Sequence, residues 1–176
     1  MTDTVIRIPE LRTARIVLRA FRASDFDAYA AMEADPEVRR YRGGNLRSAE
    51  ESWGMMAAIL GQWALRGHGI FALEDKESGR FAGFAGVFHP FDWPEPEIGY
   101  SLARPFWGRG LAREAVVAAR DWAFAALPSS ALPSFIMPDN APSIRVAKAL
   151  GAVREGSVTL RGFVSERWVH RRPSVQ

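Results

Sequence analysis

The chain has 176 residues, of which 48% are hydrophobic and 24% charged. This length allows one domain with a sizeable core, and the composition is typical of a folded globular protein rather than a disordered or fibrous one. We therefore expect a single domain over residues 1–176.

The charge and the cysteine count exclude several classes of protein. The formal net charge is only +3, and Lys76 and Lys148 are the only lysines, so nothing indicates a nucleic-acid partner. The chain has no cysteine, which excludes disulfides, thiol nucleophiles and cysteine metal ligands. Residues 1–13 lack the apolar core of a signal peptide, and no apolar run is long enough to cross a bilayer. We expect a cytoplasmic protein with no membrane partner.

The first third of the chain alternates strand and helix signals. Residues 16–21 are β-branched and apolar, which predicts a strand. Ser24 is expected to cap a helix that ends near Asp35 and Pro36, where Asp35 caps a further short turn. The arginine-rich loop over residues 39–45 favours a solvated surface over a binding role.

A long helix and a hairpin follow. Residues 48–51 have the form of a capping box, and apolar residues recur at helical spacing from Trp53 to Ala64. Residues 68–73 and 81–88 then predict two antiparallel strands joined by a turn. The proline-rich loop over residues 89–96 fits either substrate recognition or a plain surface connection.

The second half continues with two helices and three strands. An apolar stripe from Leu111 to Ala126 predicts a long helix packed on a sheet. Residues 131–137 predict a strand, with Pro133 at its edge or at its start. Asn140 and its neighbours are expected to cap a helix that ends at Gly151. Residues 153–158 and 163–169 predict the last strands, and the tail over residues 171–173 is expected to fray.

The chemistry is concentrated between the strand over residues 97–102 and the helix that begins near Leu111. Gly108 and Gly110 permit a tight turn and a close approach of a ligand to the backbone. The first N–H groups of the following helix lack intrahelical partners and carry the positive end of the helix dipole, so such a turn suits an anion. Two glycines alone favour an ordinary strand-to-helix turn over a ligand site.

Three segments in a fixed order make the signal specific: residues 97–100, residues 107–115 and residues 140–151. Together they resemble the GNAT acyltransferase family, in particular its branch similar to the ribosomal-protein N-terminal acetyltransferases (RimJ/RimL-like), over nearly the whole chain from Leu11 to Trp168. The resemblance implies an α/β (α+β) fold with a mixed, mostly antiparallel six- to seven-stranded sheet flanked by helices on both faces. It also implies acetyl-CoA as co-substrate, held between two diverging parallel strands, and no metal.

The resemblance further implies which residues hold acetyl-CoA. The pyrophosphate would lie on backbone N–H groups of the glycine turn, the backbone of two strand residues would border the pantetheine and the acetyl group, and one asparagine would contact the pantetheine arm while also capping a helix. The residues in these places are Arg109, Gly110, Leu111, Ala112, Arg113, Ser101, Leu102 and Asn140. Trp107 stands where the family commonly has glutamine or arginine. The side chains of Arg109 and Arg113 would add charge to the phosphates, or lie solvated at the helix start.

Acetyl transfer to an amine requires a base for the amine and a proton for the leaving thiolate. Glu97 is the candidate base, acting through water, although a surface carboxylate at a strand start fits the same pattern. Ser143 stands where this branch carries a serine proposed as the acid, and we expect it to hydrogen-bond or relay a proton. The tyrosine acid of many GNAT enzymes is missing, since no tyrosine follows Tyr100.

The resemblance therefore implies an acetyl-CoA-dependent N-acetyltransferase acting on a primary amine. Transfer would be direct, because no cysteine is present to carry the acetyl group. The alternatives are a non-catalytic acyl-CoA-binding or sensing module, and a nucleotide-binding protein, although no lysine of P-loop type follows the glycine turn. The acceptor, a small molecule or a protein N-terminus, is not encoded in a readable motif. A homodimer stays open.

Overall fold

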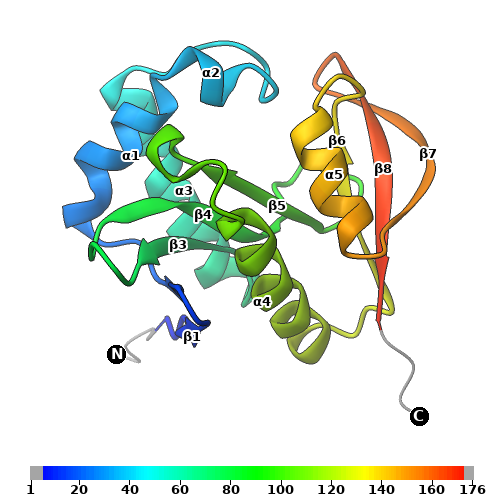
Figure 1. Cartoon of the computed structure of the whole chain (residues 1–176), viewed down its shortest axis with the longest axis horizontal. Helices are drawn as coiled ribbons and strands as arrows, with labels where there is room; N and C mark the ends of the chain where they lie inside the picture. The colour runs from blue at the N-terminus through cyan, green and yellow to red at the C-terminus, as the bar shows by residue number, and fades with distance from the viewer. Residues whose placement is uncertain (1–5, 173–176) are drawn as a thin grey trace.

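The computed structural model describes residues 6–172, and within them eight strands form two antiparallel sheets (Figure 1). The first sheet has the strands in chain order: β1 (Leu11–Arg12), β2 (Ile16–Arg19), β3 (Ile70–Asp75), β4 (Phe81–Phe88) and β5 (Glu97–Leu102). The second has the order β6-β8-β7, built from β6 (Ala131–Ile136), β7 (Val153–Leu160) and β8 (Phe163–Arg171).

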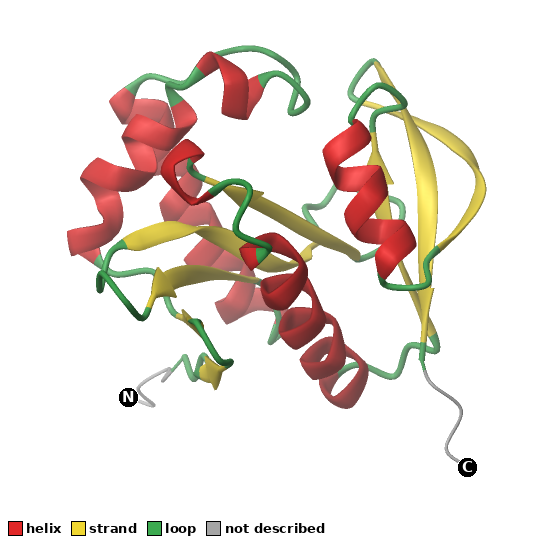
Figure 2. Ribbon diagram, in the orientation of Figure 1, coloured by secondary structure: helices red, strands yellow, loops and turns green. Residues whose placement is uncertain are grey.

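Helices cover both faces of the first sheet (Figure 2). The described residues form the helices α1 (Phe26–Glu33), α2 (Pro36–Arg39), α3 (Ala49–Arg66), α4 (Leu111–Ala126) and α5 (Ala141–Ala149), with short 3₁₀ turns η1 (Ala23–Asp25) and η2 (Arg104–Phe106). Of these, α1, α3 and α4 pack on the first sheet. Strand alternation divides the core: Phe71 and Leu73 pack with Ala115 of α4, whereas Ile70 and Ala72 pack with α1 and α3. Helix α5 packs against the second sheet through Ala147 and Trp168.

The expected α/β fold, mainly antiparallel with helices on both faces, is confirmed. The expected single mixed sheet of six to seven strands is not: the described residues form eight strands in two antiparallel sheets, which separate between β5 and β6. Two side chains join the sheets at this seam. Ser134 Oγ donates to the Ile98 carbonyl at 2.7 Å, and the Phe135 N–H donates to Glu97 Oε2 at 2.9 Å. These seam bonds involve the start of β5, whereas the end of β5 runs away from the second sheet and leads through η2 to α4 (Figure 1).

Most of the expected helix boundaries are confirmed by hydrogen bonds. Asp35 accepts from the Glu37 N–H at 3.0 Å, Ser48 forms its capping box with Glu51, and Asn140 accepts from the Ser143 N–H at 3.2 Å. Pro133 lies in β6, an edge strand of the second sheet, as its missing N–H requires. Local side-chain chemistry therefore fixes where these helices begin.

Two terminal features differ from the expectation. Ser24 does not cap α1 but lies inside η1. Asp25 stands at the N-cap position of α1 without a side-chain cap bond, because its carboxylate instead accepts from the Arg22 N–H at 2.8 Å, as part of the capping box of η1. Arg171 belongs to β8, and the Arg172 side chain donates to the carbonyls of Leu127 and Ser129, so neither residue is frayed. Pro173 lies outside the described residues.

The loop after α2 also differs from the expectation. Arg39 is only 6% exposed, and it pairs, together with Arg42 and Arg47, with the fully buried carboxylate of Glu33. The sequence predicted a solvated arginine surface because the carboxylate that pairs with these arginines belongs to α1, and the loop's own sequence does not show it.

No helix in the described part of the chain is both long and apolar enough to cross a membrane.

Candidate active site

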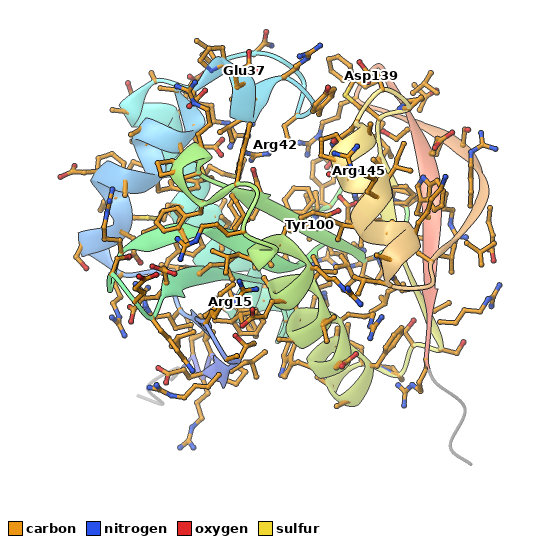
Figure 3. The ribbon with its side chains drawn as sticks, in the orientation of Figure 1. Arg15, Glu37, Arg42, Tyr100, Asp139 and Arg145 are labelled. Atoms are coloured by element: carbon orange, nitrogen blue, oxygen red, sulfur yellow. The ribbon has the colours of Figure 1, made fainter. Side chains whose placement is uncertain are left out.

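A cavity of about 720 Å³ opens where the two sheets separate. Its walls come from the end of β5, the glycine turn, the first turn of α4, the start of α5, and α2 with the residues just after it. In Figure 3, Arg42 lies on the α2 side and Arg145 on α5, with Tyr100 between them. The predicted residues Ser101, Leu102, Gly110, Leu111, Ala112, Arg113, Asn140 and Ser143 all line this cavity. Three separate segments of the chain, residues 37–42, 100–113 and 140–149, therefore meet around one cavity.

The glycine turn presents a row of free backbone donors at this cavity. Gly108 and Gly110 have φ angles of 73° and 74°, which favour glycine over residues with a Cβ. Within residues 6–172, none of the backbone N–H groups from Gly108 to Arg113 donates a hydrogen bond. Since these groups stand at the positive end of the 16-residue helix α4, the turn is suited to an anionic group such as phosphate.

Side chains on both sides hold this turn in place. Trp107 donates from its indole nitrogen to the Leu102 carbonyl at 2.7 Å, which ties the turn to the end of β5. Arg109 does not line the cavity: its guanidinium pairs with Glu77 at 3.0 Å and with Asp75 at 3.4 Å. Only the backbone of Arg109 is therefore in place to serve the predicted anion site.

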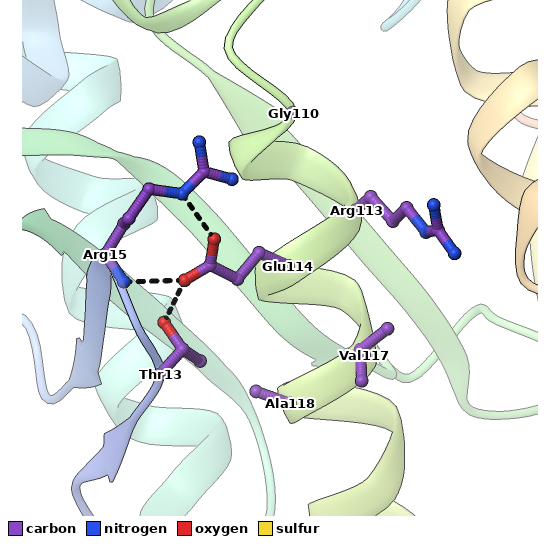
Figure 4. A pocket seen from close by; sticks show the side chains of 7 residues that line it. All are labelled: Thr13, Arg15, Gly110, Arg113, Glu114, Val117 and Ala118. Carbon is purple, nitrogen blue, oxygen red and sulfur yellow. Dashed lines mark hydrogen bonds and ion pairs between the residues drawn. The ribbon is translucent and has the colours of Figure 1, made fainter.

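A second hollow of about 360 Å³ lies beside the first turn of α4 (Figure 4). There the Glu114 carboxylate accepts from Thr13 Oγ1 at 2.6 Å and from the Arg15 N–H at 2.7 Å. Arg15 in turn donates to the Arg109 carbonyl at 2.7 Å, and so ties the N-terminal segment to the glycine turn. Sequence patterns gave no signal for this clamp, because its two sides are about a hundred residues apart.

Glu97 lies at the seam between the sheets and is not among the residues that line the cavity. It is 8% exposed, so the reading as a surface carboxylate is wrong. Its two oxygens accept from the Trp93 indole N–H at 3.0 Å and from the Phe135 N–H at 2.9 Å. Burial raises the pKa of Glu97 to about 7, against the lowering effect of these two donors. Its role as a base stays a prediction.

Tyr100 is a cavity residue that motif comparison passed over. It lies on the opposite face of β5 from Glu97, and its hydroxyl donates to the Ser143 carbonyl at 3.2 Å. Burial raises the pKa of Tyr100 to about 12, so the hydroxyl keeps its proton at neutral pH. The alternation of side chains along β5 predicts that Glu97 and Tyr100 lie on opposite faces of the strand. It does not predict which face meets the cavity, because that depends on the position of α5.

The backbone of β5 also offers a donor at the cavity. The Ala103 N–H donates to the Ala82 carbonyl of β4, so by alternation the N–H of Leu102 points away from β4, on the side of the cavity. The Leu102 N–H therefore has the orientation needed to stabilise an oxyanion, whereas the N–H of Ser101 points toward β4. Among the described residues, no cluster of three or more His, Asp or Glu side chains stands close enough together to hold a metal ion.

Comparisons with known proteins agree with this geometry. Residues 15–153 match the family model of the acetyltransferase (GNAT) domain. The chain is 31% identical over 149 residues to the uncharacterized N-acetyltransferase p20 of Bacillus licheniformis, covering 83% of each chain. The structure of an acetyltransferase from Agrobacterium tumefaciens is 31% identical, with a TM-score of 0.85 over 98% of this chain and 99% of that one.

A more distant structure has the same fold. The ribosomal L7/L12 α-N-protein acetyltransferase RimL, solved in complex with coenzyme A, is 17% identical, with a TM-score of 0.73 over 90% of this chain and 95% of that chain. The family model covers most of the chain, from residue 15 to residue 153. The chain therefore belongs to the GNAT family of acetyltransferases.

Proposed function

We propose that this enzyme transfers the acetyl group of acetyl-CoA directly to the nitrogen of a primary amine. The observation that carries the proposal is the row of N–H groups from Gly108 to Arg113, which find no acceptor within residues 6–172 and border the same cavity as Leu102, Asn140 and Ser143. Such a row supplies an anion site on one wall of a cavity of about 720 Å³, whose other walls are then free to hold the reactive group.

The predicted acetyl-CoA residues then divide the ligand between them. The turn binds the pyrophosphate, and Asn140 contacts the pantetheine arm. The Leu102 N–H donates to the thioester oxygen and stabilises the negative charge that develops there as the amine attacks the carbonyl carbon. Because an N–H aimed at the transition-state oxygen is worth roughly 3 kcal/mol, this single donor contributes about a hundredfold in rate.

Proton transfers complete the reaction. The amine nitrogen loses a proton, the carbon–sulfur bond breaks, and the CoA thiolate receives a proton. Ser143 relays the proton to the thiolate, beside the Tyr100 hydroxyl, which stays protonated because burial raises its pKa to about 12. Glu97 is proposed as the final acceptor of the amine proton through water, since a carboxyl group with a pKa of about 7 is poised to accept one at neutral pH.

Amine-dependent release of the CoA thiol tests the proposal. We expect wild-type protein to release thiol from acetyl-CoA faster when amino acids, peptides with free N-termini, polyamines or aminoglycosides are added singly. Ser143→Ala should lower that rate by roughly a hundredfold, the lower end for general acid–base catalysis. Ser157→Ala is the matched control, because Ser157 lies in the exposed part of β7, away from the cavity.

The same assay separates the alternative function. A non-catalytic acyl-CoA-binding module would bind acetyl-CoA in calorimetry, yet no amine would increase thiol release and Ser143→Ala would change nothing. Other expectations from the sequence stay predictions: the RimJ/RimL-like branch, the single domain over residues 1–176, the cytoplasmic location and the lack of a nucleic-acid partner. Whether the protein forms a homodimer stays open.

A further inference from the structure

The cavity wall formed by α2 and the residues after it is built on one buried carboxylate. Glu33, the last residue of α1, is fully buried, and three guanidinium groups pair with it. Arg42 Nη1 lies 2.6 Å from Glu33 Oε1, while Arg39 Nη1 and Arg47 Nη1 lie 3.2 and 2.9 Å from Oε2. One carboxylate with three arginines leaves the Glu33 cluster (Glu33, Arg39, Arg42 and Arg47) with a surplus of positive charge.

A partly buried surplus of charge is costly unless an anion compensates it. Burial, reinforced by the neighbouring Arg42, lowers the pKa of Arg39 to about 10, which is the direction expected where positive charge is in excess. Among the described residues, Glu33 is the only carboxylate that pairs with these three arginines. The three arginines and the one carboxylate therefore leave the cluster with a net charge of +2.

Arg42 is the one member of the cluster that lines the cavity. Its guanidinium is held from one side by Glu33 and lies over the Phe84 ring, 4.8 Å from the centroid. Its Nε and Nη2 donate to no other group in the described part of the chain, and its side chain is 25% exposed. A guanidinium fixed in this way, with two adjacent N–H donors free, matches the two oxygens of a carboxylate.

The anionic parts of acetyl-CoA have other partners in the same cavity. The glycine turn offers its free N–H groups, and Arg113 of α4 and Arg145 of α5 line the cavity without a carboxylate partner among the described residues. Arg42 instead stands on the α2 side, with Tyr100 between it and Arg145 (Figure 3). This separation leaves Arg42 available for the second substrate.

We propose that Arg42 binds a carboxylate of the acceptor, and that the acceptor is a small primary amine that carries this carboxylate. The inference rests on the proposed function, since it assigns the second substrate of the same cavity. The Glu33 cluster holds the Arg42 guanidinium in position, and the acceptor carboxylate offsets part of the cluster's surplus positive charge.

Matched pairs of acceptors test this inference. Free α-amino acids, β-alanine and γ-aminobutyrate are each compared with their own carboxamide in the thiol-release assay. Chemistry alone favours the carboxamides, because their amines lose a proton more easily. We expect the carboxylates to have the higher kcat/KM by roughly tenfold to a hundredfold, the worth of a charged hydrogen-bonded pair.

Three variants locate the effect. Arg42→Met should abolish the preference by raising the KM for the carboxylate acceptor while leaving the KM for acetyl-CoA unchanged. Arg42→Lys should keep part of the preference, since it retains the charge without the fork. Arg47→Met is the matched control: it removes another partner of Glu33 from a residue that does not line the cavity, and should keep the preference.

Several outcomes overturn the inference. Equal use of carboxylates and carboxamides by wild-type protein does so even if Arg42→Met fails to fold. A raised KM for acetyl-CoA in Arg42→Met assigns Arg42 to the co-substrate instead. If acetyl-CoA binds but no amine of either kind releases thiol, the proposed transfer to an amine fails together with this inference; if only carboxamides react, the transfer stands and the carboxylate site fails.

Discussion

Glu97 gives a residue-scale test of how burial sets a carboxyl group's properties. Its pKa is about 7 in the folded protein because burial penalises the charged form, against an ordinary value of 4.5. Between these two values the folded state binds more protons than the unfolded state, so the free energy of unfolding falls as pH rises. The expected loss between pH 4.5 and pH 7 is about 3 kcal/mol.

Glu97→Gln should remove this contribution. Chemical denaturation of wild-type protein and the variant at pH 5 and pH 7.5 measures it: the wild type should lose about 3 kcal/mol more than the variant over this range. Histidines and other groups titrate equally in both proteins, so the difference isolates Glu97. An unchanged pH dependence in the variant would mean that Glu97 is ionised throughout.

The same variant tests whether Glu97 is the base. If it is, kcat falls by roughly 10²–10⁴ and the rate limb near pH 7 disappears. If Glu97 only holds β5 against β6 through Phe135, kcat is retained while stability changes. Measuring both kcat and the free energy of unfolding of this variant therefore distinguishes a catalytic role of Glu97 from a structural one.

Other residues mark what the sequence could and could not predict at this scale. Asn140 and the glycines of the turn were identified because capping and left-handed φ angles depend on local chemistry. The sequence did not predict that Glu97 lies at the seam, that Tyr100 lines the cavity or that Glu33 pairs with Arg42. Each of these contacts depends on elements that only the tertiary fold brings together.

At the scale of elements, periodicity and caps predicted every long helix and strand. The separation of β5 from β6 was outside the reach of these patterns, since Glu97 and Ser134 read as ordinary strand residues until they join two sheets. Trp53 and Trp63 both belong to the apolar stripe of α3, yet Trp53 is exposed and Trp63 is buried. The spacing of apolar residues predicts the helix, but it does not predict which part of the stripe other elements cover.

The element that a substitution tests most directly is the glycine turn with the first turn of α4. Gly110→Glu places a negative charge beside the free N–H groups, so acetyl-CoA binding should weaken roughly hundredfold or more in calorimetry. Gly151→Glu is the control: Gly151 has a φ of 75° against 74° for Gly110, and it does not line the cavity. The two variants share backbone strain and added charge, and differ only in place. Undiminished binding by Gly110→Glu would contradict the assignment of the turn.

At the scale of the whole molecule, the cavity is shared by two halves, one built on each sheet. Leu102 and the glycine turn belong to the first sheet and α4, whereas Asn140 and Ser143 belong to α5 on the second sheet. A ligand that reaches from the turn to Asn140 touches both halves, and so stabilises their arrangement as well as each surface.

Acetyl-CoA should therefore raise the melting temperature and protect both halves from hydrogen exchange. At a concentration one hundred times Kd, the expected gain is about 2.7 kcal/mol, which for a domain of this size corresponds to a rise of roughly 5–10 °C. Amides at the end of β5 and in the first turns of α4 and α5 should exchange more slowly together, and Gly110→Glu should show neither effect at the same concentration. Protection confined to α4 would mean that the ligand occupies the turn alone. Protection on both sides requires a ligand that contacts both halves of the cavity. Acetyl-CoA must do so if its acetyl group is to reach an amine bound near Arg42.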